Sequence, residues 1–166
     1  MLRLFAVLLT VAMVAGVAPA RADATAEAKK LGDLFCLVAM NARDGGEFGR
    51  LYLVTRSLGA AIDEAIRRND EIAIAEPGDK PPIGDGVPFQ SYPDTPPVCH
   101  AGKFTEADGK QTVEVQYIFT DTPDANWTDR LALASEDGRL RIDDVMFGTE
   151  SSGGGLRSAL VELFKN

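Results

Sequence analysis

The chain has 166 residues, with 17 lysines and arginines against 25 aspartates and glutamates, and a net charge of −8 at pH 7. An acidic surface repels nucleic-acid phosphates and anionic lipids, so the composition argues against nucleic acid or a charged membrane as a partner. A cationic protein or a small ligand stays open as a partner. The same acidity would also serve simply to keep the protein soluble. The length suits a single domain with its own core.

The first 22 residues have the pattern of a secretory signal peptide. Arg3 provides a positive start, Leu4–Ala18 is apolar apart from one threonine, and small residues stand at peptidase spacing in residues 18–20 and 20–22. The apolar run of about 15 residues is shorter than the about 20 that span a bilayer. We therefore expect residues 1–22 to be removed on export from a bacterial cell. Residues 23–166 would then work as one domain in the periplasm or medium, with no membrane attachment.

Two amphipathic helices are expected before the middle of the chain. In the first, over residues 24–40, apolar side chains recur every three or four residues: Ala28, Leu31, Leu34, Phe35 and Val38. The second covers residues 51–66 and follows a turn-forming segment at residues 41–46. Ser57 or Gly59 is expected to divide it, with Ser57 as the capping residue.

A proline-rich loop is predicted over residues 76–98. Seven of the nine prolines lie in it: Pro77, Pro81, Pro82, Pro88, Pro93, Pro96 and Pro97. Because proline removes a backbone donor and fixes φ, neither a long helix nor a central strand fits this segment. A loop of this length in a compact domain is functional or held in place by other contacts.

Beyond residue 99 the apolar pattern alternates, as in strands with one buried face. The expected elements are strands over residues 100–105, 112–119, 127–133 and 140–145, hairpin turns at Asp108-Gly109 and Glu136–Gly138, and an amphipathic helix over residues 156–164. N-terminal helices, an antiparallel meander of about four strands and a C-terminal helix make an α+β domain.

Three short segments carry a resemblance to known proteins. They are Leu51–Leu58 (LYLVTRSL), Gly84–Ser91 (GDGVPFQS) and Leu140–Val145 (LRIDDV). Together they resemble small exported bacterial proteins of unknown function within the nuclear-transport-factor-like superfamily of cone-shaped α+β domains. Leu140 stands where that group often has a tryptophan. The resemblance implies a curved sheet wrapped onto the N-terminal helices, with a concave pocket. It implies no activity, because the superfamily holds enzymes, ligand binders and interaction modules.

The two cysteines, Cys36 and Cys99, are expected to form a disulfide, because export places them in an oxidising compartment. Such a bond closes a loop of about 60 residues, which chain-entropy reasoning values at about 4 kcal/mol. It would also hold the proline-rich loop to the first helix. Two free buried cysteines would leave the same pattern in the sequence. No CxxC spacing is present, which argues against a thiol oxidoreductase.

No catalytic residue is assigned, and Asp144 and His100 are the two candidates considered for a chemical role. Side chains alternate along a strand, so Asp144 should share the core face of Leu140 and Ile142, where a carboxylate must be paired or protonated. In a concave pocket, Asp144 could form an acid–base set with His100, the single histidine, or with Tyr117. We favour the structural interpretation, in which Asp144 caps a loop or meets an arginine at the end of the sheet.

No cofactor or metal site is expected. Asp121, Asp124, Asn126 and Asp129 gather within nine residues, but the spacing matches no EF-hand loop and lacks its glycine and final glutamate. We interpret them as an ordinary polar turn. A single histidine also offers little to a zinc site, which normally takes several nitrogen or sulfur ligands.

Three functions fit these patterns. The leading hypothesis is an exported, non-catalytic domain that binds a protein partner or a small ligand, with the sheet concavity or the proline-rich loop as the recognition surface. One alternative is an acidic inhibitor or immunity-type partner of a cationic exported enzyme. The other is a small enzyme that uses Asp144 and His100 in a concave pocket.

Overall fold

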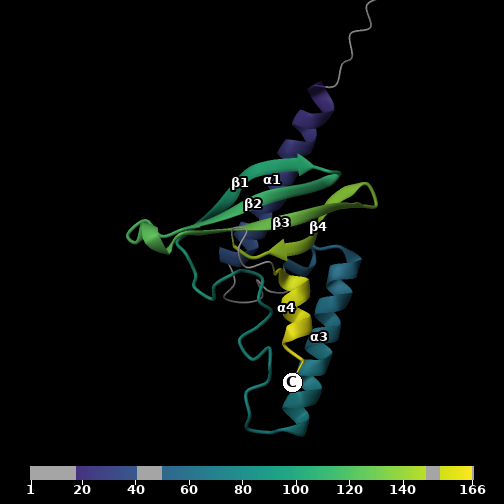
Figure 1. Ribbon diagram of the computed structural model, residues 1–166, viewed down its shortest axis with the longest axis vertical. Coiled ribbons are helices and arrows are strands. Elements are labelled where there is room, and N and C mark those ends of the chain that lie inside the picture. The colour runs from purple at the N-terminus through teal and green to yellow at the C-terminus, as the bar shows by residue number, and fades with distance from the viewer. Residues whose placement is uncertain (1–17, 41–49, 149–153, 166) are drawn as a thin grey trace, which may run out of the picture.

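The structure is a computed structural model that describes residues 18–40, 50–148 and 154–165 (Figure 1). Its main elements, in chain order, are α1 (Ala18–Met40), α3 (Arg56–Ala75), β1 (Val98–Ala107), β2 (Lys110–Ile118), β3 (Trp127–Glu136), β4 (Arg139–Met146) and α4 (Leu156–Glu162). The predicted α+β order of helices, strands and closing helix is confirmed. Of the expected signal segment, residues 1–17 lie outside the described residues and residues 18–22 belong to α1.

The four strands form one antiparallel sheet in the order β1-β2-β3-β4. Both predicted hairpins are present: Asp108 (φ 51°) and Gly109 (φ 71°) join β1 to β2, and Asp137 (φ 51°) and Gly138 (φ 74°) join β3 to β4. Positive φ at both central positions is typical of the two-residue turns that match strand twist, and Asp-Gly adopts it readily. Residues 119–126 connect β2 to β3, and the four strands thus form a simple meander.

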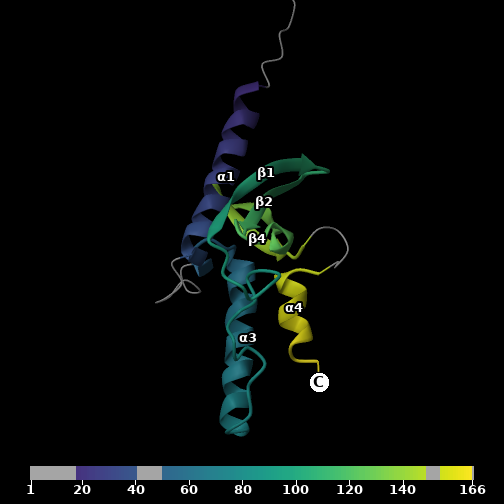
Figure 2. The same cartoon turned by 90° about the vertical axis from the view of Figure 1, so that its left-hand side faces the viewer.

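The helices approach the sheet from two sides. The first helix, α1, lies against β1 and β2, whereas α3 and α4 pack on each other and reach the sheet at β4. Figures 1 and 2 show α1 alongside the sheet and the α3–α4 pair projecting from it. The largest buried side chains of the shared core are Phe35, Leu58, Ile62, Phe89, Tyr117, Leu131, Ile142 and Leu156.

The helix α3 begins at Arg56, and Thr55 caps it, so the expectation of a cap at Ser57 is wrong. The Thr55 Oγ1 accepts a hydrogen bond from the Leu58 N–H at 3.1 Å. The preceding residues run beside β4, where the Thr55 N–H donates to the Ile142 carbonyl at 2.8 Å and the Ile142 N–H to the Leu53 carbonyl at 3.0 Å. This pairing keeps the backbone extended as far as Thr55. The helix then continues through Gly59 to Ala75, beyond the expected end at residue 66.

The segment between α3 and β1 forms neither helix nor strand, as predicted from its prolines. It follows α3 and returns to the sheet (Figures 1 and 2). Buried Ile83, Val87 and Phe89 attach it to the core, and the Asn69 side chain accepts a hydrogen bond from the Ile83 N–H at 2.8 Å. The loop is therefore held along its length, as well as at its end by Cys99.

Candidate functional site

The disulfide between Cys36 and Cys99 is present, with the two Cα atoms 5.4 Å apart. Cys36 lies on α1 and is 2% exposed, and Cys99 stands second in β1. The bond therefore joins the first helix to the sheet at the point where the proline-rich loop ends. The prediction of a crosslink is confirmed, and the alternative of two free thiols is excluded.

Tyr117 belongs to the core of the sheet. It is 1% exposed, and its ring stacks on Trp127 with centroids 4.6 Å apart. Its hydroxyl has no hydrogen-bond partner within the described part of the chain. Burial raises the pKa of Tyr117 well above its usual range. The negative charge of Asp129 raises this pKa further, whereas the positive charge of Arg50 lowers it. Tyr117 therefore stays protonated at neutral pH.

Asp129 is fully buried on β3, so its interpretation as part of a polar turn is wrong. Its carboxylate accepts hydrogen bonds from the Ser91 N–H at 3.0 Å and from the Gly148 N–H at 2.9 Å, and also from the Ser91 hydroxyl. Three donors satisfy a buried carboxylate that would otherwise be costly to desolvate. Asp129 thus fastens the proline-rich loop and the end of β4 to the sheet.

Asp144 does not share the core face with Ile142, contrary to the expectation from simple alternation. A β-bulge is the reason: Ala132 pairs with Asp144, but the next residue of β3, Leu133, pairs with Ile142. Asp143 is the extra residue, and after it Val145 takes the buried position. The Asp144 Oδ1 accepts hydrogen bonds from the Val145 N–H at 2.8 Å and the Arg157 N–H at 3.1 Å. Asp144 therefore caps the start of α4, which is the kind of structural role that the sequence pattern favours for it.

The structure does not bring Asp144 and His100 together. His100 is exposed on β1 and Asp144 lies on β4, and these are the two outer strands of the sheet. Three strand spacings, roughly 14 Å, separate such residues even when they are level with one another. Tyr117, on β2, faces the core. The predicted acid–base set is therefore not assembled, and the interior where it would act is filled by side chains such as Leu131.

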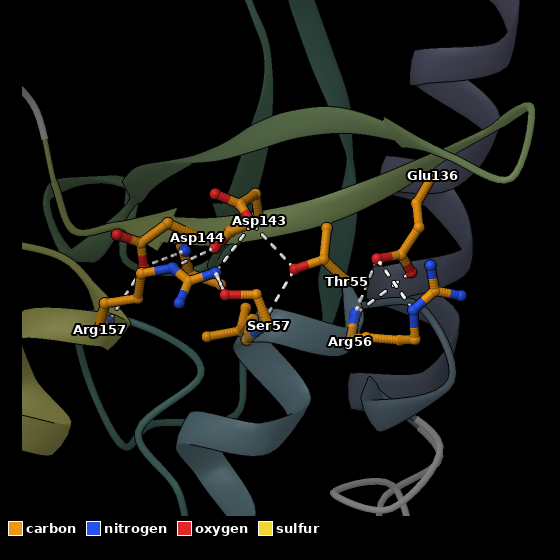
Figure 3. A network of polar contacts seen from close by, with 9 residues as sticks. Thr55, Arg56, Ser57, Glu136, Asp143, Asp144 and Arg157 are labelled. Carbon is orange, nitrogen blue, oxygen red and sulfur yellow. Dashed lines mark hydrogen bonds and ion pairs between the residues drawn. The ribbon is translucent and has the colours of Figure 1, made fainter.

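A polar network joins β4 to the starts of α3 and α4 (Figure 3). The Asp143 Oδ1 accepts hydrogen bonds from the Thr55 hydroxyl and from Arg157 Nη2, both at 2.8 Å. Arg157 also donates through Nε to the Asp143 carbonyl at 2.7 Å and through Nη2 to the Ser57 hydroxyl at 3.3 Å. These contacts hold the Arg157 side chain in one position. Ser57 thus bonds Arg157 and does not cap α3.

A pocket of about 420 Å³ lies beside this network, where the outer face of β3 and β4 meets the start of α4. Its lining residues are Arg130, Asp144, Met146, Phe147, Gly154, Gly155, Arg157 and Ser158. Gly155 approaches β4 so closely that a Cβ there would lie 2.8 Å from the Val145 carbonyl oxygen and 2.9 Å from Asp144 Oδ2. A side chain at position 155 would therefore push α4 away from β4 and change the shape of the pocket.

Arg130, which lines this pocket, is assigned no role from the sequence. Its Nε is buried and has no hydrogen-bond partner among the described residues. The ion pairs within the described ranges do not include it. A buried donor without a partner is uncommon in native proteins, because desolvating it costs free energy that no bond returns. Because Arg130 also lines the pocket, its guanidinium can donate hydrogen bonds to an oxygen-bearing group from outside the chain.

Comparison with known proteins finds no matching family model, no matching curated protein and no matching solved structure. The geometry alone must therefore support a function. Within the described ranges, no helix has both the length and the apolar character to cross a membrane. In the same ranges, no three histidine, cysteine, aspartate or glutamate side chains gather as metal ligands would.

Proposed function

We propose that this protein is an exported domain that binds a small ligand in the pocket between β3, β4 and α4, without transforming it. The observation that carries this proposal is Arg130, a cation with a buried, unpartnered Nε at the wall of a pocket of about 420 Å³. Pockets of this size accommodate small organic molecules, and a few polar groups on apolar walls are typical of binding sites.

Export is proposed on the pattern of the first 22 residues. The disulfide between Cys36 and Cys99 is compatible with an oxidising compartment. The relation to the nuclear-transport-factor-like superfamily is likewise a proposal, and it rests on the three sequence segments named above.

Binding without catalysis is favoured because the charged residues around the pocket have structural tasks. Asp144 holds the start of α4, and Asp143 holds Arg157 and Thr55. A general base needs a lone pair directed at the substrate together with a partner that orients it. Asp143 has orienting partners in Thr55 and Arg157, but it does not line the pocket, so its carboxylate is not directed at a ligand there.

A thermal-shift experiment tests this function. Heat unfolding of the disulfide-bonded protein would be followed with monocarboxylates, amines, amino acids and inorganic phosphate, and compared with Met146→Trp, which places an indole in the pocket. A ligand that binds only the folded state raises the unfolding temperature. We expect at least one compound to raise it for the wild type and not for Met146→Trp.

The matched control is Thr105→Trp, which adds the same indole to an exposed position of β1. It should respond to the compound as the wild type does. If no compound shifts the wild type, or if Met146→Trp responds equally, the proposed function is wrong.

A further inference from the structure

Three charged residues line the pocket: Arg130, Arg157 and Asp144. Arg157 is paired with Asp143, which leaves Arg130 and Asp144 to be considered. Arg130 stands opposite Met146 in the β3–β4 ladder, and Asp144 stands two residues before Met146 on the same face. Such diagonal neighbours lie about 7–8 Å apart. No ion pair within the described ranges joins them. A small molecule can therefore enter between the two charges.

Asp144 and Arg130 differ in how many of their polar atoms already have hydrogen-bond partners within the protein. Both hydrogen bonds of Asp144 end on Oδ1, so Oδ2 accepts none from a described residue. The guanidinium of Arg130 carries five donors. Its Nε has no hydrogen-bond partner among the described residues, and no ion pair within those ranges includes Arg130. Arg157, by contrast, is matched by Asp143 at 2.8 Å. One positive and one negative group thus remain for a ligand.

We propose that the ligand is a zwitterion of the free α-amino acid type. This inference rests on the proposed function of the pocket. The ligand's carboxylate binds the Arg130 guanidinium, where planar, paired N–H donors suit a carboxylate. Its ammonium group binds Asp144 Oδ2, and its apolar side chain lies against Met146 and Phe147, which also line the pocket.

The charge of the walls argues against a phosphate group at this place. Asp144 already accepts from the Arg157 N–H at the start of α4, so that backbone donor is not offered to an anion. The Asp144 carboxylate lies in the pocket wall, and its negative charge repels a phosphate dianion. A ligand with no net charge and with separated charges meets no such penalty.

Calorimetric titration of the disulfide-bonded protein with matched probes tests the inference. L-leucine carries both charges, 4-methylpentanoate lacks only the ammonium group, and 3-methylbutylamine lacks only the carboxylate; inorganic phosphate is the fourth probe. Each charge-assisted hydrogen bond lost should weaken binding by about tenfold or more. We expect L-leucine to bind at least about tenfold more tightly than either analogue, and phosphate not to bind.

Two variants separate the roles of the charged residues. Arg130→Gln should remove the preference for L-leucine over 3-methylbutylamine. Asp144→Asn should remove the preference over 4-methylpentanoate, and it should fold, because asparagine also caps helices well. Arg139→Gln, an exposed arginine at the start of β4, is the matched control and should change nothing.

The outcomes distinguish the inference from the function on which it rests. If an analogue or phosphate binds as tightly as L-leucine, the pocket is a binding site but its ligand is not a zwitterion. The same conclusion follows if Asp144→Asn keeps the full preference over 4-methylpentanoate. If none of the four probes binds, and no compound in the thermal-shift experiment acts through the pocket, both proposals fail.

Discussion

At the scale of single residues, Tyr117 has a buried hydroxyl group for which the described residues offer no hydrogen-bond partner. Removing an unpartnered buried hydroxyl is neutral or stabilising, since no bond is lost and less polar surface is desolvated. The stacking on Trp127 and the burial of the ring do not need it. We therefore expect Tyr117→Phe to leave the free energy of unfolding unchanged or to raise it by up to about 1 kcal/mol.

The same residue makes stability depend on alkaline pH. Burial raises the pKa of Tyr117 in the folded protein, whereas in the unfolded chain it ionises near its ordinary value of about 10. Above about pH 10 the unfolded state releases a proton that the folded state retains. The free energy of unfolding therefore falls as the pH rises, by about 1.4 kcal/mol per pH unit for one such group.

Urea unfolding on both sides of about pH 10 would measure this effect. The wild type should lose stability more steeply than Tyr117→Phe as the pH rises. Equal slopes for the two proteins would show that Tyr117 ionises as freely in the folded state as in the unfolded chain.

At the scale of elements, the disulfide joins α1 to β1 at the point where the proline-rich loop ends. It connects residues 63 positions apart. Replacing both Cys36 and Cys99 by serine should lower the free energy of unfolding by about 4 kcal/mol, chiefly because the unfolded chain regains freedom. Denaturant unfolding of the wild type with and without reductant should reproduce the difference. Equal midpoints for the wild type and the double variant would contradict this account of the loop.

The strands and hairpins could be predicted from the sequence because their signals are local. A period of two identifies β2 and β3, and Asp-Gly fits the positive φ of each turn. The start of α3 could not be predicted, since pairing with β4 decides that Thr55 and not Ser57 is the cap. The bulge at Asp143 moves the Asp144 side chain to the face of the sheet opposite to the core. No local sequence pattern indicates this bulge.

The pocket was missed for the same kind of reason. Alternation alone places Arg130 on the face opposite to Leu131. Alternation does not show that the start of α4 lies beside the face of β3 that carries Arg130, nor that the Arg130 Nε is buried there. The role of Asp129 depends likewise on Ser91 and Gly148, which are 38 and 19 residues away in the sequence. Long-range contacts determined these sites, whereas the disulfide could be predicted because only two cysteines are present.

At the scale of the whole molecule, the export proposal predicts where the working domain begins. Ala22 and Asp23 are exposed, and the first core residue of α1 is Ala28. A chain starting at Asp23 should therefore unfold at the same temperature as the full chain. The protein recovered from the periplasm or medium should begin at Arg21 or Asp23, as N-terminal sequencing would show. Recovery from the cytoplasm with Met1 in place would contradict export.

The central claim is that the described pocket is a binding site built around Arg130. Its most direct test is NMR spectroscopy of the ¹⁵N-labelled, disulfide-bonded protein, with the arginine Nε–Hε signals followed during titration with L-leucine. The account predicts that the Arg130 signal shifts in a saturable manner while the signal of Arg139 stays in place. An unchanged Arg130 signal, or equal shifts of the two arginines, would contradict it.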